Sequence, residues 1–224
     1  MTYSICARDP DSGALAVAVA TCNLAVGALV PFVKAGVGAV ASQARSNPLF
    51  GGWALELLEQ GADAETVVAE ITARDDSRDH RQLHVVDARG RSAVFTGDSC
   101  VTWAGAQAHD GFSVAGNMLS GPEVLPAMVA AYEGSNGEAL PLRLVAVLKA
   151  GEAAGGDKRG RQSAAMRIVT DQPYPWLDLR VDDDADPVGR LQHLLDLFDS
   201  PEMSRQRAFR PTLANPHNVL PPTG

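Results

Sequence analysis

The chain has 224 residues, 46% of them hydrophobic and 21% charged, which is typical of a globular protein with one large domain. A net charge of −8 at pH 7 and a pI near 5.0 argue against nucleic acid or an anionic membrane as a general partner, because the basic surface that neutralises phosphates is missing. We therefore expect a small-molecule partner.

The cysteines and the first residues indicate the compartment. Cys6, Cys22 and Cys100 have no C-x-x-C spacing and cannot all pair, which favours a reducing environment. The first eight residues lack the basic region and apolar core of a signal peptide, and no apolar run approaches the length of a membrane span. We expect a cytoplasmic protein with no membrane partner.

The first half of the chain is predicted to form two hairpins, two helices and an antiparallel meander. Asn47 and Pro48 are typical of a helix start, and the apolar spacing of this helix continues to Gly61. A second helix is expected at residues 63–72. The predicted strands lie at residues 3–7, 14–20, 26–33, 37–42, 82–87, 92–96, 100–105 and 111–114.

The second half is predicted to contain helices at residues 121–132, 139–151 and 187–198 and strands at 164–169 and 177–181. Strands and helices thus occur in separate runs, which favours an α+β domain with two sheets between helix layers over alternating βαβ units. Residues 200–224 hold five prolines and little apolar periodicity. We predict a single domain at 1–199 and a Pro-rich tail at 200–224.

Thr2 directly follows the initiator methionine. Removal of Met1 would give Thr2 both a nucleophilic hydroxyl and a free α-amine, which can act as its base. The amine has an unperturbed pKa of roughly 7.7 to 8.0, and a nearby cation such as Lys34 would lower it. In the alternative interpretation Thr2 simply begins a strand and Lys34 lies at a strand end.

The densest set of functional groups lies at residues 155–164, which read GGDKRGRQSA and fall between a helix and a strand. The glycines let several backbone N–H groups point at one spot. Asp157 could hold a protonated amine, and Arg159 or Arg161 a carboxylate. The spacing does not match a Walker loop. The alternative is a helix C-cap followed by a solvated charged turn.

Three further residues are candidates. His80 could act as an acid-base group or bind substrate, as histidine side chains often do, or it could be a surface histidine in a turn. Asn117 could donate its amide to an oxyanion, or be a turn residue. Cys22 is a rival nucleophile without a histidine near it in sequence. His80 and His84 do not share a helix face, so we predict no metal, and we predict no cofactor.

The order of these residues resembles the proteasome β-subunit branch of the N-terminal-nucleophile hydrolases. In this resemblance Thr2 matches the nucleophile, Lys34 the distant lysine and Asp157 the late aspartate. Gly160 stands where that branch usually has a serine, and the pair Gly116-Asn117 stands where it has Gly-Ser. These two departures affect the expected proton relay.

Five stretches resemble more closely the family called domain of unknown function 1028. They are residues 3–10, 35–41, 80–82, 116–119 and 155–164, and the resemblance covers roughly residues 2–199. The resemblance implies a four-layer αββα sandwich, in which two antiparallel sheets are flanked by helices. It implies no particular substrate.

The leading hypothesis is an enzyme that hydrolyses an amide bond of a small metabolite. The Thr2 hydroxyl would attack the carbonyl, with Lys34 lowering the pKa of the amine and Asp157 orienting either group. Backbone donors near Ser46 and Asn47, or the Asn117 side chain, would hold the oxyanion. The candidate substrate-binding residues are His80, Arg159, Arg161, Ser46, Asn47 and Gly160.

Two alternatives stay open. One is a protein of the same fold that retains Met1 and binds a metabolite or anion at residues 157–161 without catalysis. The other is a structural subunit of a ring or dimer. We expect a homo-oligomer.

Overall fold

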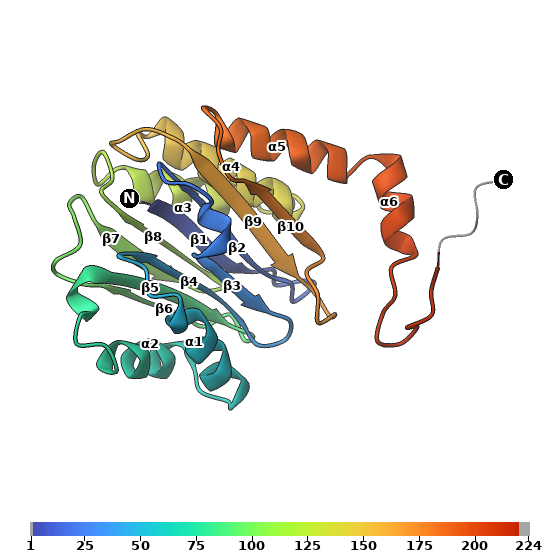
Figure 1. Ribbon diagram of the computed structural model, residues 1–224, viewed down its shortest axis with the longest axis horizontal. Helices are drawn as coiled ribbons and strands as arrows, with labels where there is room; N and C mark the ends of the chain where they lie inside the picture. The colour runs from blue at the N-terminus through green and yellow to red at the C-terminus, as the bar shows by residue number, and fades with distance from the viewer. Residues whose placement is uncertain (1, 220–224) are drawn as a thin grey trace.

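The protein is described by a computed structural model, which covers residues 2–219. These residues contain two antiparallel β-sheets and six α-helices (Figure 1). The six-stranded sheet has the order β10-β9-β2-β1-β8-β7, and the four-stranded sheet has the order β3-β4-β5-β6. The α+β class predicted from the sequence is confirmed.

The strands are β1 (Thr2–Arg8), β2 (Leu15–Thr21), β3 (Pro31–Lys34), β4 (Gly38–Ala44), β5 (Arg81–Asp87), β6 (Ser92–Thr96), β7 (Gly105–His109), β8 (Phe112–Asn117), β9 (Ser163–Val169) and β10 (Leu177–Val181). The α-helices are α1 (Leu49–Glu59), α2 (Ala64–Ala73), α3 (Val124–Gly134), α4 (Leu140–Ala153), α5 (Pro187–Phe198) and α6 (Pro201–Ala208).

The central strand β1 is buried on both faces, and its side chains alternate between two environments. Tyr3, Ile5 and Ala7 belong to the apolar cluster that includes residues of α3, α4 and α5. Ser4 and Cys6 point the other way and contact His84 of the four-stranded sheet. Because successive side chains of a strand point to opposite faces, Thr2 faces the second sheet as well.

Helices cover one face of each sheet. In Figure 1, α3, α4 and α5 lie over the six-stranded sheet, and α1 and α2 lie beneath the four-stranded sheet. The remaining faces of the two sheets pack on each other through β1 with β4 and through β5 with β8. We call the space between the two sheets the intersheet layer. Its two ends lie where these inner strands begin and end.

Two predicted strands differ in the structure. Residues 26–33 contain a short 3₁₀ turn at Val26–Ala28 before β3, because Ala25, the residue before the turn, has a left-handed rather than an extended backbone conformation. Residues 100–105 are a connection, because their backbone pairs with residues just after β8: the Leu119 N–H donates to the Trp103 carbonyl over 2.9 Å. β7 instead begins at Gly105.

The predicted tail contains a helix. Ser200 caps α6 by accepting a hydrogen bond from the Met203 N–H, and Pro201 occupies its first turn. None of its residues is buried, so the apolar periodicity that predicts a helix is missing from its sequence. Figure 1 shows α6 standing away from the two sheets. Within residues 2–219 no helix has the length and apolarity needed to cross a membrane.

Candidate functional site

Thr2 lies at one open end of the intersheet layer, where β1 begins and where β2 and β8 end. Thr2 pairs directly with Asn117 across the β1–β8 ladder. On its other side, the Thr2 hydroxyl donates to the Thr21 hydroxyl over 3.3 Å. Thr2 is 7% exposed and Asn117 2% exposed. We call Thr2, Thr21, Asn117 and Asp157 the Thr2 corner.

Asp157 reaches this corner on the loop that follows α4. Gly155 and Gly156 turn the chain with φ of 108° and 48°, and a Cβ at Gly155 would lie 2.3 Å from the Ser120 hydroxyl. A β-bridge between Leu119 and Asp157 then fastens the loop to the residues after Asn117. The sequence predicted this turn but not the bridge that holds it.

The Asp157 carboxylate is buried and has several donors. It accepts the Cys22 N–H over 2.7 Å and the Arg159 N–H over 2.8 Å, and it forms an ion pair with the Arg159 guanidinium at 3.2 Å. Its side chain is 1% exposed. Asp157 thus joins the end of β2 to its own loop, and Arg159 neutralises its charge.

A cavity of about 360 Å³ lies against the same corner, on the helix side of the six-stranded sheet. Its walls include Tyr3, Thr21, Asp157, Gly160 and Arg161, but Thr2 is not among them. Lys149 and Glu152 of α4 also line it. The cavity and the Thr2 hydroxyl therefore lie on opposite faces of β1 and share the wall formed by Thr21 and Asp157.

Charged side chains line part of the cavity. The Arg161 guanidinium lies 2.9 Å from one oxygen of Glu152, and this contact raises the pKa of Arg161. The other Glu152 oxygen is buried, and no hydrogen-bond partner for it exists in the described part of the chain. Burial, together with the carboxylates of Glu152 and Asp157, raises the pKa of Tyr3. The Tyr3 hydroxyl is therefore neutral and available as a hydrogen-bond donor.

A network of buried amides fixes Asn117 from the intersheet side. Gln82 is completely buried, and its carbonyl oxygen accepts from the Asn117 amide over 3.0 Å and from the Gln43 amide over 2.8 Å. Its own amide donates to the carbonyls of Gly105 and Gly116. Asn117 is therefore held in one orientation, and its second N–H donates to no other group within residues 2–219.

The same layer holds a buried histidine. His84 Nε2 lies 2.8 Å from the Ser4 hydroxyl, whose proton goes to Gln43, so Nε2 donates. Nδ1 lies 2.9 Å from the Ser113 hydroxyl and accepts from it in this tautomer. Burial lowers the pKa of His84 to about 3, so the ring is neutral in the folded protein.

This pKa predicts acid sensitivity. The unfolded chain binds a proton at His84 below about pH 6.5, whereas the folded chain does not until about pH 3. His84 therefore contributes stability above pH 6.5 that is lost as the pH falls toward 3. We expect its contribution to the unfolding free energy to fall by about 2 kcal/mol between pH 7 and pH 5.

Urea unfolding of the wild type and of His84→Gln at both pH values checks this expectation. Glutamine keeps hydrogen-bonding capacity but does not titrate, so the variant should show the smaller pH dependence even if it is less stable overall. Equal dependence in both proteins would exclude His84 as the source.

Lys34 does not reach the Thr2 corner. It pairs with Gly38 at the start of β4. At the other end of β4, Gln43 accepts a hydrogen bond from the Ser4 hydroxyl of β1. The two ends are roughly 16 Å apart at about 3.3 Å per residue. Lys34 is half exposed and forms an ion pair with Glu59 at 2.6 Å. Its place at a strand end fits the alternative interpretation from the sequence.

Ser46 and Asn47 lie just after β4, at the same end of the layer as Thr2, but their side chains stabilise the loop. The Ser46 hydroxyl donates to the Ser42 carbonyl over 2.9 Å. The Asn47 oxygen accepts the Leu49 N–H, and its amide reaches Asp75 at 3.4 Å. The Asn47 contacts therefore join the start of α1 to the turn after α2.

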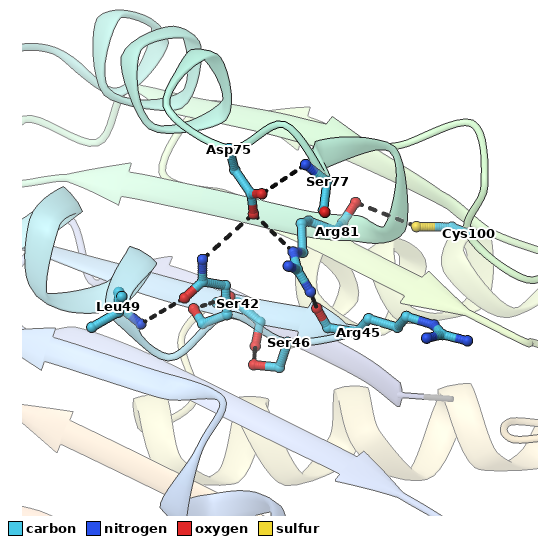
Figure 2. Close-up of polar contacts among 9 residues, drawn as sticks. Ser42, Arg45, Ser46, Leu49, Asp75, Ser77, Arg81 and Cys100 are labelled. Atoms are coloured by element: carbon cyan, nitrogen blue, oxygen red, sulfur yellow. Dashed lines mark hydrogen bonds and ion pairs between the residues drawn. The ribbon is translucent and has the colours of Figure 1, made fainter.

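Figure 2 shows Arg81 joining that turn to the loop after β4. Arg81 forms an ion pair with Asp75 at 2.9 Å and donates to the Arg45 carbonyl over 2.5 Å. His80 precedes it in an exposed 3₁₀ turn, and its carbonyl accepts the Arg45 N–H. His80 thus lies at the same end of the layer, and within residues 2–219 it forms no hydrogen bond or ion pair with Asp157.

Several residues of the site were not predicted from the sequence: Tyr3, Thr21, Gln43, Gln82 and Glu152. The sequence does contain a signal for two of these residues. Gln43 and Gln82 are amides inside strands that are otherwise buried, and such polar groups must find partners. Within residues 2–219, no three histidine, cysteine or acidic side chains are grouped so that they could hold a metal ion.

Comparisons with known proteins identify relatives. A family model described as "Family of unknown function (DUF1028)" matches residues 2–191. The crystal structure of protein SPO2555 from Silicibacter pomeroyi, described with the same family, is 32% identical, with a TM-score of 0.92 over 100% of this chain and 97% of that chain. No curated protein matches the sequence.

More distant structures are also similar. The ancestral β-subunit Anbu from Yersinia bercovieri is 13% identical, with a TM-score of 0.42 over 89% of this chain and 98% of that chain. A Gly-1 mutant of Anbu from Hyphomicrobium sp. strain MC1 is 13% identical, with a TM-score of 0.42 over 88% of this chain and 94% of that chain.

Proposed function

We propose an enzymatic function for this chain, which belongs to the DUF1028 family of unknown function: hydrolysis of an amide bond in a small metabolite, with Thr2 as an N-terminal nucleophile. The proposal includes the four-layer αββα sandwich of N-terminal-nucleophile hydrolases. The packing of helices on one face of each sheet, and of the sheets on each other, supports that architecture.

One observation carries the proposal. The Thr2 hydroxyl is buried at the first residue of the central strand, bonded to Thr21 and directly opposite an asparagine whose amide is fixed by Gln82. Without Met1, the α-amine would begin at the same buried position. Burial disfavours the charged amine, so it lowers the amine pKa toward neutrality without the contribution expected of Lys34.

The chemistry follows from this arrangement. The Thr2 amine takes the proton of its own hydroxyl as the oxygen attacks the amide carbonyl. The second N–H of Asn117 donates to the oxyanion that develops. When the intermediate collapses, the amine returns the proton to the leaving nitrogen. A water molecule, deprotonated by the same amine, then hydrolyses the ester at Thr2.

Asp157 has a positioning role in this proposal. Its carboxylate holds the Cys22 N–H, one residue after Thr21, and so fixes the end of β2 beside Thr2. The adjacent cavity, with the Tyr3 hydroxyl and the Arg161 guanidinium on its walls, would take the polar part of a small substrate. We further propose that residues 1–199 form the domain and that the protein is a homo-oligomer.

An electrophilic β-lactone tests the nucleophile. We expect one equivalent to attach to the wild type, with the adduct on the peptide that begins at Thr2 when the digest is read by mass spectrometry. Cys22→Ala should be labelled as the wild type is, and Thr2→Ala should not be labelled. An adduct on Cys22 instead of Thr2 would contradict the proposal and identify the rival nucleophile.

A binding protein without catalysis is the second candidate. It is favoured by the cavity itself, whose lining includes Lys149, Arg161 and Tyr3 but not Thr2. In that case Met1 is retained, Arg161→Ala weakens a bound anion, and Thr2→Ala leaves its affinity unchanged. Titration of the two variants with a small carboxylate separates the two functions.

A further inference from the structure

A second cavity lies at the opposite end of β1 from Thr2. It has a volume of about 380 Å³, within the range of small-molecule sites. Arg8, the last residue of β1, lines it, and β1 places Arg8 roughly 20 Å from Thr2 at about 3.3 Å per residue. We call it the arginine pocket, defined by Arg8, Arg89, Arg143, Phe112 and Tyr132.

Arg143 is the buried cation of this pocket. It projects from α4, is 6% exposed, and stacks on the Tyr132 ring with its guanidinium carbon 3.9 Å from the ring centroid. One terminal nitrogen donates to the Tyr132 carbonyl and to the Asn136 side chain. Its Nε is buried, and it has no hydrogen-bond partner within residues 2–219. A guanidinium group as buried as that of Arg143 is costly unless a negative charge lies close to it.

Two more arginines converge on the same cavity. Arg8 is held in place by a hydrogen bond from its Nε to the Ala88 carbonyl at 2.8 Å. Arg89, in the β5–β6 turn, is exposed, and its side chain forms no hydrogen bond within residues 2–219. In the same part of the chain, no carboxylate lies within ion-pairing distance of Arg8, Arg89 or Arg143, although ion pairs are frequent elsewhere.

The charge and lining of the pocket define its ligand. Asp110 and Glu133 also line it, so the three arginines leave one positive charge in excess in a protein whose net charge is −8. Phe112 and Tyr132 supply an aromatic wall, with ring centroids 4.5 Å apart. Guanidinium groups bind carboxylate and phosphate oxygens in pairs of hydrogen bonds.

We propose that the arginine pocket binds a small metabolite that carries one carboxylate or phosphate-ester group on an apolar body. The oxyanion lies among the three guanidinium groups and accepts from Arg143, and the apolar body packs on Phe112 and Tyr132. The site is separate from the Thr2 corner, so its occupancy does not require the hydrolase function proposed above.

Isothermal titration of the full chain with phenyl phosphate, benzoate and inorganic phosphate tests the site. We expect at least one of the two aromatic anions to bind with a Kd of about 1 mM or below, and to bind more tightly than inorganic phosphate. The aromatic anion that binds more tightly shows whether the site prefers a phosphate-ester or a carboxylate head group. Affinity should fall as salt is added, because the attraction is between charges at a partly open site.

Variants locate the binding. Arg89→Ala should weaken the preferred probe about tenfold, since it removes a charge-assisted contact. Arg205→Ala in α6 is the matched control, because Arg205 is also exposed and forms no side-chain hydrogen bond among residues 2–219. It should bind as the wild type does, as should Thr2→Ala. Arg143→Lys keeps the charge but loses the planar fork, and a folded variant should also bind about tenfold more weakly.

Three results would overturn the proposal. The first is no saturable binding of any probe at about 10 mM. The second is equal affinity in Arg89→Ala and Arg205→Ala. The third is a change in sedimentation of Arg89→Ala without a change in probe affinity, which would assign the arginines to contacts between subunits. Arg89 is exposed, so its replacement keeps the test valid even if Arg143→Lys does not fold.

Discussion

Thr2→Ala is expected to reduce amide hydrolysis by at least about a thousandfold, because no other group can replace an attacking hydroxyl that carries its own base. Thr2→Ser, which keeps both the hydroxyl and the amine, should retain measurable turnover. The measurement is the release of free amine from a panel of small N-acyl compounds, followed for the wild type and both variants.

Stability provides the control for this comparison. Among residues 2–219 the Thr2 hydroxyl makes one hydrogen bond, to Thr21, so Thr2→Ala should change the unfolding free energy by only about 1 kcal/mol. Thr21→Val removes the same hydrogen bond from the other side and should slow hydrolysis without abolishing it. Equal activity in the wild type and Thr2→Ala would exclude Thr2 as the nucleophile.

Asp157→Asn is expected to have the second largest effect. The substitution removes the charge that pairs with Arg159 and puts an amide where the Cys22 and Arg159 N–H groups need an acceptor. Arg159 is partly exposed, so water relieves part of the loss. We expect the unfolding free energy to fall by about 3 kcal/mol and hydrolysis by about a hundredfold.

Asp182→Asn is the matched control for Asp157→Asn. Asp182 also forms an ion pair with an arginine, Arg180, at 3.0 Å, but its side chain is 52% exposed. An exposed pair contributes little, so this variant should lose less than about 1 kcal/mol and no activity. Urea unfolding of both variants gives the comparison. Similar losses would mean that Asp157 acts only as a surface charge.

The strands and helices with clear periodicity were predicted well from the sequence. The bounds of β10 and α5 were predicted to the residue, and the first hairpin to within one residue at each strand end. These segments place apolar side chains at spacings that only one kind of element can bury. In contrast, α6 buries nothing, so no periodicity marks it.

The site was predicted less completely, and Lys34 explains why. A residue at the end of a strand lies at one of two ends of a sheet, and only the pairing of the strands decides which. Here β3 and β4 meet at the end remote from Thr2, so Lys34 faces Glu59. Asn117, by comparison, reaches Thr2 because β8 runs antiparallel to β1 and ends where β1 begins.

The partners of a buried polar group are equally hidden in the sequence. Gln82 is separated from Gln43 by 39 positions and from Asn117 by 35, so nothing local predicts their hydrogen bonds. The sequence does indicate that such amides must be paired once their strands are buried. Which amides pair follows from the register of β4, β5 and β8.

The intact mass of the purified protein tests the central claim most directly. We predict a mass lower than that of the full sequence by one methionine residue, with Thr2 as the first residue on N-terminal sequencing, because only then is the Thr2 amine free to act as the base. A mass that retains Met1 in an otherwise folded protein would contradict the account, since the nitrogen of Thr2 would then be an amide with no basic character.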